Sequence, residues 1–426
     1  MERVIWQQLD KEGQERALRR SDLVQDTQVA DTVSAILNRV KSDGDAGVKA
    51  LTEQFDGAMP ADWVIEPDEM AAAGNRLNRS LKAAVDQAID NIGRFHSAQQ
   101  PQTLSLNVAS GVRCELRSEA IERVGLYVPG GTAPLISTVL MLALPARIAG
   151  CALKVMVTPP PVNDAILYAA SRCGVDALYT IGGAQAVAAL AYGTETVPKV
   201  DKIFGPGNRF VTEAKAQVSQ QGTAIDMPAG PSEVLVIADD SANPAFVAAD
   251  LLSQAEHGAD SQVMLVTNSA SLADEVAAEV ARQLAALPRA DMAGAALAQS
   301  RVILADSLQQ ACDISNAYAP EHLIVQTRAP RELLPLLRAA GSIFLGPWTP
   351  ESVGDYVSGT NHVLPTYGAA RTASSLSLAD FQRRFTVQEL TREGLAGLSN
   401  AVTTLAEAEG LRAHANAVTL RMEAQP

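Results

Sequence analysis

The sequence predicts an α/β fold that contains two parallel-sheet lobes and a helical C-terminal tail. Short β-branched runs alternate with helical segments from residue 124 to about residue 346, and several of these runs end in a glycine turn that opens a helix. This order of elements is typical of a parallel sheet with helices on its faces. The 426 residues, 47% of them apolar, are enough for more than one hydrophobic core.

The element order follows from local periodicity. Residues 27–97 carry apolar residues at helical spacing, with Gly44 and Gly57 as breaks, and the polar residues 110–122 read as a connecting hairpin or loop. After about residue 375 the strands give way to helices, at 391–410 and 411–420. The other expected elements are strands at 124–128, 154–158, 177–181, 202–204, 233–239, 262–267, 301–306, 323–325 and 342–346, and helices at 244–257, 271–287, 308–318 and 330–340.

The domain division follows the places where the strand–helix pattern stops and restarts. We expect four parts, of which the inserted lobe carries the glycine turns. They are an N-terminal arm (1–24), a first α/β lobe that includes the N-terminal helices (25–123 and 232–375), an inserted second α/β lobe (124–231) and a helical tail (376–426).

Composition narrows the class of protein. A net charge of −14 and a pI near 4.9 disfavour nucleic acid as a partner. The four cysteines form no CxxC pair and suggest a reducing compartment. The N-terminus is too polar for a signal peptide, and Pro145 and Arg147 interrupt the most apolar run, so we expect a cytoplasmic protein and no membrane span. The cysteines are Cys114, Cys151, Cys173 and Cys312.

Three glycine turns fall at the carboxyl ends of expected strands in the inserted lobe. Tyr127 precedes Gly130–Gly131, Gln185 follows Gly182–Gly183, and Asn208 follows a Gly-Pro-Gly sequence. Strands of a parallel sheet end at one edge, and helix N-termini there favour phosphate, so a dinucleotide is a sensible ligand. The alternative is that the glycines only form tight turns, since no GxGxxG or P-loop sequence is present.

The segment "LLSQAEHGAD" ends an apolar helix with polar side chains. Asn243 suits the N-cap and Gly258 the stop. Gln254 and His257 are three residues apart, so two potential metal ligands share one face. Glu256 points elsewhere, which excludes HExxH chemistry, and the alternative for His257 is interaction with the helix dipole.

Other polar residues are candidates for proton transfer or metal binding. Glu321 and His322 lie between a helix and a strand, as a pair of bases or as a surface charge pair. Asp355 lies in a glycine-rich loop, as a metal ligand or in an Asx turn, and His362 is expected to have a supporting role. In the tail, "LAEAEGLRAH" contains a further acid–imidazole pair, Glu409 and His414, which is an ordinary solvated face unless the tail reaches a site.

Together these segments resemble the histidinol dehydrogenase family. The matching strings include "VGLYVPGGTAP", "IDMPAGPSEVLVIAD", "DLLSQAEH", "APEHL" and "GDYVSGTNHVLPT", in order along the chain. The resemblance implies two Rossmann-like lobes and a homodimer whose helical tails are exchanged between subunits. It also implies one zinc ion per subunit, bound by Gln254, His257 and Asp355 of one chain and His414 of the other, with room for substrate.

The resemblance implies oxidation of L-histidinol to L-histidine through the bound aldehyde, with two NAD, as the last step of histidine biosynthesis. His322 takes the hydroxyl proton and Glu321 activates water. The substrate contacts are carried over to Ser232, Gln254, His257, His322, Asp355, Glu409 and His414. The NAD contacts are carried over to Tyr127, Gln185 and Asn208.

Alternative functions follow from the same features. A related zinc and NAD dehydrogenase could oxidise another amino or sulfonated alcohol. An aldehyde dehydrogenase would use a cysteine nucleophile, but none of the four cysteines has a reactive setting. A metal-dependent nucleotide-binding regulator is a non-enzymatic alternative, and it would form no NADH from histidinol.

Overall fold

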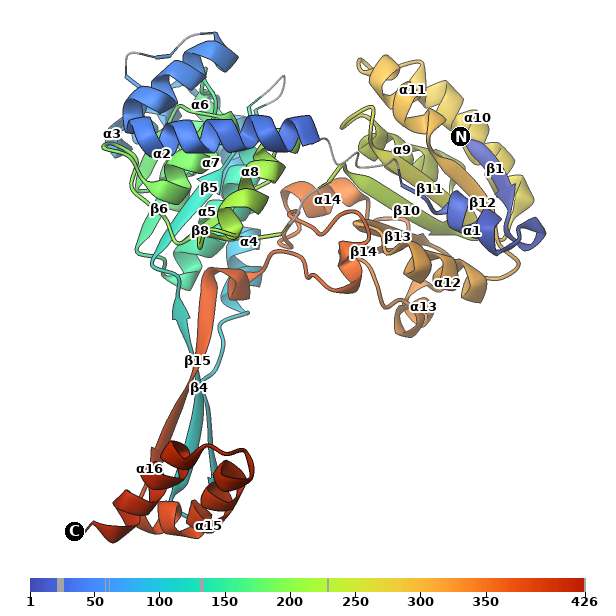
Figure 1. Ribbon diagram of the computed structural model, residues 1–426. Helices are drawn as coiled ribbons and strands as arrows, with labels where there is room; N and C mark the ends of the chain where they lie inside the picture. The colour runs from blue at the N-terminus through green and yellow to red at the C-terminus, as the bar shows by residue number, and fades with distance from the viewer. Residues whose placement is uncertain (21–26, 58, 61, 131–133, 228–229, 425–426) are drawn as a thin grey trace. The chain divides into compact units, whose positions relative to one another are not determined.

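The computed structural model describes residues 1–426 except 21–26, 58, 61, 131–133, 228–229 and 425–426. The chain divides into two units, one of residues 1–99 and 121–381, the other of residues 100–120 and 382–426 (Figure 1). The first unit holds two parallel-sheet regions with helices, as predicted. Within the described residues, no helix is both long and apolar enough to span a bilayer.

One six-stranded sheet of the first unit has the order β1-β12-β11-β10-β13-β14, and its paired strands are all parallel. Alternate residues of β10 face opposite cores: Val234 and Val236 pack with α9, whereas Leu235 and Ile237 pack with α12. Its strands are β1 (Glu2–Ile5), β10 (Glu233–Ala238), β11 (Gln262–Thr267), β12 (Arg301–Leu304), β13 (His322–Gln326) and β14 (Ser342–Leu345). The accompanying helices are α1 (Lys11–Ala17), α9 (Pro244–Ala255), α10 (Ala270–Leu284), α11 (Ala290–Ala298), α12 (Leu308–Tyr318), α13 (Pro330–Leu333) and α14 (Glu351–Tyr356).

The other six-stranded sheet has the order β2-β7-β6-β5-β8-β9, parallel except for the antiparallel edge strand β2. The order of β5 to β9 repeats that of β10 to β14. In each sheet the first strand of the series (β5 or β10) has the next two strands on one side and the fourth (β8 or β13) on the other. The strands are β2 (Val64–Ile65), β5 (Arg123–Tyr127), β6 (Leu153–Val157), β7 (Ala177–Tyr179), β8 (Lys202–Phe204) and β9 (Ala224–Ile225). The helices are α2 (Thr27–Asp56), α3 (Pro67–Ala73), α4 (Arg79–Ser97), α5 (Ile136–Ala149), α6 (Asp164–Cys173), α7 (Gly183–Tyr192) and α8 (Arg209–Ser219).

The N-terminal helices do not belong to the lobe that the sequence suggested. We assigned residues 25–123 to the lobe of 232–375, but α2 buries Val33 and Val40 in one core with Val187 of α7. The edge strand β2 also pairs with β7. The N-terminal arm contains β1, which pairs with β12 in the lobe of residues 232–375. Both assignments depend on long-range packing that local periodicity does not encode.

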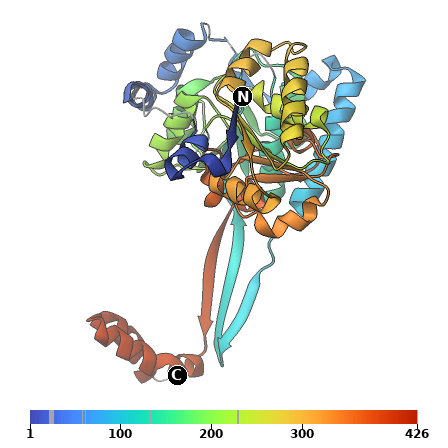
Figure 2. The ribbon, with the colours of Figure 1, turned by 90° about the vertical axis from the view of Figure 1, so that its right-hand side faces the viewer.

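The second unit contains a three-stranded antiparallel sheet and two helices (Figures 1 and 2). The polar segment predicted as a hairpin or loop forms a hairpin of β3 (Leu104–Ala109) and β4 (Val112–Ala120). Strand β15 (Gln382–Leu390) pairs with β4 over its whole length. The expectation that the tail holds only helices is wrong here, although α15 (Arg392–Ala408) and α16 (Arg412–Glu423) follow as predicted.

Several boundaries differ from the periodicity prediction. The predicted break at Gly44 is present, because this residue adopts non-helical angles (φ 55°, ψ −134°) at a kink that divides α2 into two helical segments, whereas the boundaries that follow differ. The helix expected at 330–340 is only α13 and one 3-10 turn. Asp355 lies in α14 and not in the glycine-rich loop that follows it. The 3-10 turns are Trp6–Gln8, Gly74–Arg76, Leu334–Leu336, Ala369–Arg371 and Leu378–Phe381.

Candidate active site

The candidate proton-transfer residues lie where two adjacent parallel strands begin. Strand β10 begins at Glu233 and β13 begins at His322, and Val234 is in register with His322. Helix α12 ends at Tyr318, so Glu321 and His322 lie at the predicted helix–strand junction. Both side chains are buried, which argues against a surface charge pair.

Glu321 and His322 are tied to each other and to β10. The Nδ1 atom of His322 lies 3.2 Å from the carbonyl oxygen of Glu233 and 3.5 Å from Oε2 of Glu321. The same Oε2 accepts a hydrogen bond of 2.9 Å from the Glu233 N–H. A carbonyl can only accept, so Nδ1 is the protonated ring nitrogen in this contact and Nε2 is left to face the site.

Helix α9 brings Gln254 into the same region. The predicted cap is present: the side chain of Asn243 accepts from the Ala245 N–H, and Pro244 is the first helical residue. Gln254 is fully buried in the last turn, with its amide nitrogen donating to Glu351 and its amide oxygen accepting from the Glu233 N–H at 3.1 Å. His257 lies two residues beyond the helix, is exposed, and its charge acts on Asp355.

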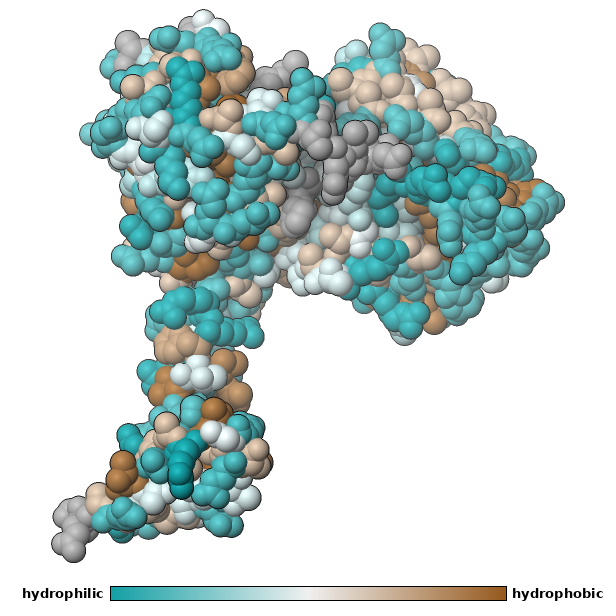
Figure 3. All heavy atoms as spheres, viewed as in Figure 1, coloured by the Kyte–Doolittle hydropathy of each residue, from teal (hydrophilic) through white to brown (hydrophobic). Residues whose placement is uncertain are grey.

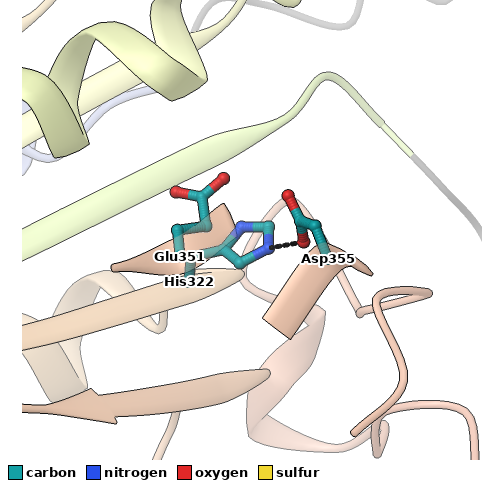
Figure 4. Close-up of side chains that lie close together, drawn as sticks. All are labelled: His322, Glu351 and Asp355. Atoms are coloured by element: carbon teal, nitrogen blue, oxygen red, sulfur yellow. Dashed lines mark ion pairs between the residues drawn. The ribbon is translucent and has the colours of Figure 1, made fainter. Parts of the chain in front are cut away.

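Helix α14 supplies two carboxylates, of which the sequence analysis identified only one. Asp355 Oδ1 lies 3.7 Å from His322 Nε2, and ligand atoms of His322, Glu351 and Asp355 all lie within 4.8 Å of one another (Figure 4). Glu351 is not among the residues predicted from the sequence, because Asp355 is expected in a glycine-rich loop and no helical spacing is expected before it. The available signal was the spacing of four residues between Glu351 and Asp355 directly after a proline, which places both on one face of a short helix.

The cluster contains polar atoms that lack partners. Among the described residues, Nε2 of His322 and Oε2 of Glu351 are buried without a hydrogen-bond partner. Buried polar groups are normally satisfied, and unpaired buried charge is costly. The two atoms therefore mark a place where a ligand with positive charge or donor groups fits.

Burial and mutual charge shift the pKa values of this cluster in opposite directions. Burial raises the pKa of Glu351 to about 8, with Asp355 and Glu321 adding to the rise. Burial lowers the pKa of His322, but the charges of Glu351 and Glu321 outweigh it and hold that pKa well above its usual range. Burial also opposes ionisation of Asp355, yet His322 lowers its pKa overall. The site thus places the carboxyl groups of Glu321, Glu351 and Asp355 around one imidazole.

Two further predicted residues border this cluster. His362 places Nδ1 3.1 Å from the carbonyl oxygen of Asp355, so it supports the end of α14. Ser232 lies immediately before Glu233, is half-buried, and its carbonyl oxygen accepts from the Gln262 N–H. Both residues thus lie beside the cluster and contact the backbone there.

The three residues expected to contact NAD line one pocket of about 540 Å³. Tyr127 ends β5, and its hydroxyl accepts from the Gly183 N–H at 3.1 Å, which joins the first two glycine turns. Gln185 is buried in the first turn of α7, and Asn208 caps α8 by accepting from the N–H groups of Phe210 and Val211. Gly131 of the first turn lies outside the described residues.

Glu409 and His414 belong to the second unit. Glu409 is the C-cap of α15 and His414 lies in the first turn of α16, and both side chains are exposed. They lie on either side of the turn between the two helices, and their exposure is that of the solvated face which the sequence offered as the alternative. Their expected contribution to the zinc and substrate site of a partner subunit therefore stays a prediction.

The cysteines are poor candidates for a nucleophile. All four thiols are free, and three are buried. Burial raises the pKa of Cys151 to about 11, that of Cys173 to about 12 and that of Cys312 to about 11. A reactive cysteine needs its thiolate, which these environments disfavour.

Comparison with known proteins gives one consistent family. The model of the histidinol dehydrogenase family matches residues 18–422. Histidinol dehydrogenases of Shewanella oneidensis and Aliivibrio fischeri are each 60% identical, over 99% of this chain and 99% and 97% of theirs. The crystal structure of histidinol dehydrogenase from Elizabethkingia anophelis is 43% identical, with a TM-score of 0.96 over 99% of this chain and 98% of that one. The chain therefore belongs to the histidinol dehydrogenase family of NAD-dependent oxidoreductases.

Proposed function

We propose that this chain oxidises L-histidinol to L-histidine through bound L-histidinaldehyde, with two NAD, as the last step of histidine biosynthesis in the cytoplasm. The carrying observation is the buried Glu321–His322 pair at the start of β13, beside Gln254 and the two carboxylates of α14. Family membership over the whole chain supports the same assignment.

The same cluster fits a zinc ion. We assign as ligands Gln254, His257 and Asp355 of one chain, with His414 of the partner subunit. The donor set contains only nitrogen and oxygen, and the proposal is supported by the unpartnered buried atoms of His322 and Glu351, which lie beside the assigned ligand Asp355. Bound zinc supplies a template that orients the substrate through the substrate's imidazole and amino groups.

Two neighbouring bases suit the two oxidations. His322, through Nε2, takes the hydroxyl proton of histidinol as the first hydride leaves for NAD. Glu321 then takes a proton from the water that attacks the aldehyde. The resulting hydrate transfers the second hydride to the second NAD and loses a hydroxyl proton to solvent as the carboxyl group of histidine forms. A cation held among the same carboxylates acts against the upward pKa shift of His322, which favours its basic form.

The remaining contacts are assigned to substrate and cofactor. Ser232, together with Glu409 of the partner subunit, contacts histidinol. Tyr127, Gln185 and Asn208 contact NAD in the pocket that they line. Helices α7 and α8 begin at this pocket, so the positive ends of their dipoles favour the cofactor's phosphates.

We assign the second unit to a homodimer with exchanged tails. Leu104 and Leu106 lie on one face of β3, and both of them, like Val108 at the irregularity that follows, are more than half exposed. Leu405 and Leu420 of the two helices are also exposed, and hydrophobic patches are visible on this unit in Figure 3. Apolar surface of this kind is costly in water, and a second copy of the chain would cover it.

The test is NADH formation from L-histidinol, before and after removal of metal by a chelator. We expect two NADH for each histidine formed, loss of activity on chelation, and recovery with zinc. Binding of zinc and NAD without NADH formation would instead support a nucleotide-binding regulator. Turnover of other amino alcohols with no turnover of histidinol would assign the chain to another substrate.

A further inference from the structure

Glu233 and Glu321 hold each other's backbone at the start of two adjacent strands. Oε2 of Glu321 accepts from the Glu233 N–H at 2.9 Å, and Oε1 of Glu233 accepts from the Glu321 N–H at 3.2 Å. Both residues precede the first ladder bonds between β10 and β13, which begin at Val234 and His322. Each carboxylate therefore satisfies a backbone donor for which the sheet offers no acceptor.

The Glu233 carboxylate is itself fixed by a buried network. Arg20 donates to both of its oxygens, at 2.6 and 2.9 Å, and stacks on the ring of Tyr318 at 3.8 Å. The hydroxyl of Tyr318 lies 2.9 Å from Oε2 of Glu233. The side chain of Glu233 is 2% exposed and that of Arg20 is 14% exposed, so this is a bidentate pair shielded from water.

We propose that Glu233 is a positioning residue for the water-activating base Glu321, an inference that rests on the proposed function. The argument depends on which contacts belong to the Glu233 side chain. His322 is held by the backbone carbonyl of Glu233, which every substitution retains, whereas the main chain of Glu321 is held by the carboxylate. Loss of the carboxylate therefore disturbs Glu321 more than His322, and aldehyde oxidation more than alcohol oxidation.

A glutamine at this position cannot replace the carboxylate. Arg20 presents a hydrogen to each of the two oxygens of Glu233, and the Glu321 N–H presents a further one to Oε1. An amide has only one oxygen, so in either orientation its NH₂ group faces a donor. The mutual repulsion moves the Glu321 backbone, and small misplacements of a catalytic group cost about 10- to 100-fold in rate.

The experiment compares both half-reactions in Glu233→Gln by single-turnover kinetics, with L-histidinol and with L-histidinal as substrates. We expect the aldehyde step to slow about 10- to 100-fold, with a much smaller change in the alcohol step and in KM for both substrates. Because Glu233→Gln leaves Arg20 partly unpaired, the double variant Arg20→Met/Glu233→Met, which removes both charges, provides a second measurement if the single variant does not fold. Glu115→Gln is the matched control, because it removes another buried, arginine-paired glutamate, at 2.6 and 2.7 Å from its two arginines.

The decisive comparison repeats Glu233→Gln in a Glu321→Gln background. We expect Glu321→Gln alone to stall the aldehyde step, and the added substitution to slow that step no further. A further loss of equal size would show a general structural effect and overturn the positioning role, as would an unchanged aldehyde step in the folded variants. An aldehyde step that survives in Glu321→Gln would instead contradict the assignment of Glu321 in the proposed function.

Discussion

Asp250 carries a carboxyl group into the core between α9 and β13. It is 5% exposed and accepts a hydrogen bond of 2.5 Å from Gln326 Nε2, while Oε1 of Gln326 is buried and has no partner among the described residues. Burial raises the pKa of Asp250 to about 7, and the hydrogen bond from Gln326 only partly opposes the rise. The neutral acid is therefore the form that this environment prefers near neutral pH.

We predict that Asp250→Asn changes the pH dependence of stability. From the ordinary pKa of an aspartate up to about 7, the native state holds a proton that the unfolded chain has lost, so the contribution of Asp250 to stability falls as pH rises. Asparagine does not titrate, so the variant lacks this fall. Above pH 7 its free energy of unfolding should exceed that of the unmodified protein by about 1 to 4 kcal/mol. Urea unfolding of the zinc-free protein at several pH values measures this, and equal pH slopes for both proteins would refute it.

Single residues differ in how far the sequence reveals them. Glu321 and His322 are adjacent, so their pairing was visible in the string "APEHL". Glu351 and Glu233 were not identified, because their roles depend on burial beside residues that are distant in the chain. The sequence gives the charge of a side chain but not whether that side chain is exposed to solvent.

At the scale of elements, the third glycine turn is anchored by a buried ion pair. Lys215 of α8 lies 2.5 Å from Asp226, and the two side chains are 4% and 1% exposed. Lys215 donates to the carbonyl oxygen of Gly205 at 2.7 Å, and Asp226 accepts from the N–H of the same glycine, also at 2.7 Å. The pair thus holds both backbone groups of the residue that begins the turn toward Asn208.

We predict that Lys215→Met weakens NAD binding as well as the fold. Removal of one partner leaves a buried charge, which costs roughly 3 to 5 kcal/mol, and it frees the turn that lines the pocket. Denaturant unfolding should show the loss, and KM for NAD should rise while KM for histidinol changes little. The matched control is Lys154→Met, which breaks the pair between Lys154 of β6 and Asp176 and should leave KM for NAD unchanged. Equal effects of both variants on that KM would remove the special role of Lys215.

Elements with their own periodicity were predicted, and elements that depend on partners were not. The first strand of each Rossmann-like region, β5 or β10, carries a continuous apolar run, such as Val234–Ala238. Such a run predicts a buried parallel strand. Short edge strands β1, β2 and β9 and the exposed strand β15 have no such pattern. They are strands because a neighbouring strand supplies hydrogen-bond partners.

At the scale of the whole molecule, the proposed sharing of sites between subunits makes a quantitative prediction. Inactive Gln254→Ala and His414→Ala subunits, when mixed, should form heterodimers in which one of the two sites is complete. Random mixing makes half of the dimers heterodimers, so about one quarter of the wild-type activity should return. Refolded or exchanged mixtures assayed for NADH measure it.

The control for this experiment mixes Gln254→Ala with His257→Ala. Both substitutions alter the share of the site that one chain contributes, so no heterodimer contains a complete site and no activity should return. Recovery in this control, or none in the Gln254→Ala and His414→Ala mixture, would argue against exchanged tails.

Sequence alone determined the two-lobed parallel architecture, the family and the adjacent acid and imidazole groups, because these features are written in local patterns of a few to a few dozen residues. Tertiary structure decided which lobe receives the N-terminal helices and which carboxylates surround His322. It also decided that Glu233 and Glu321 bind each other's backbone, although 88 positions separate them. The physical reason is that strand register, burial and the pairing of buried charges depend on contacts between distant segments, which only the folded chain brings together.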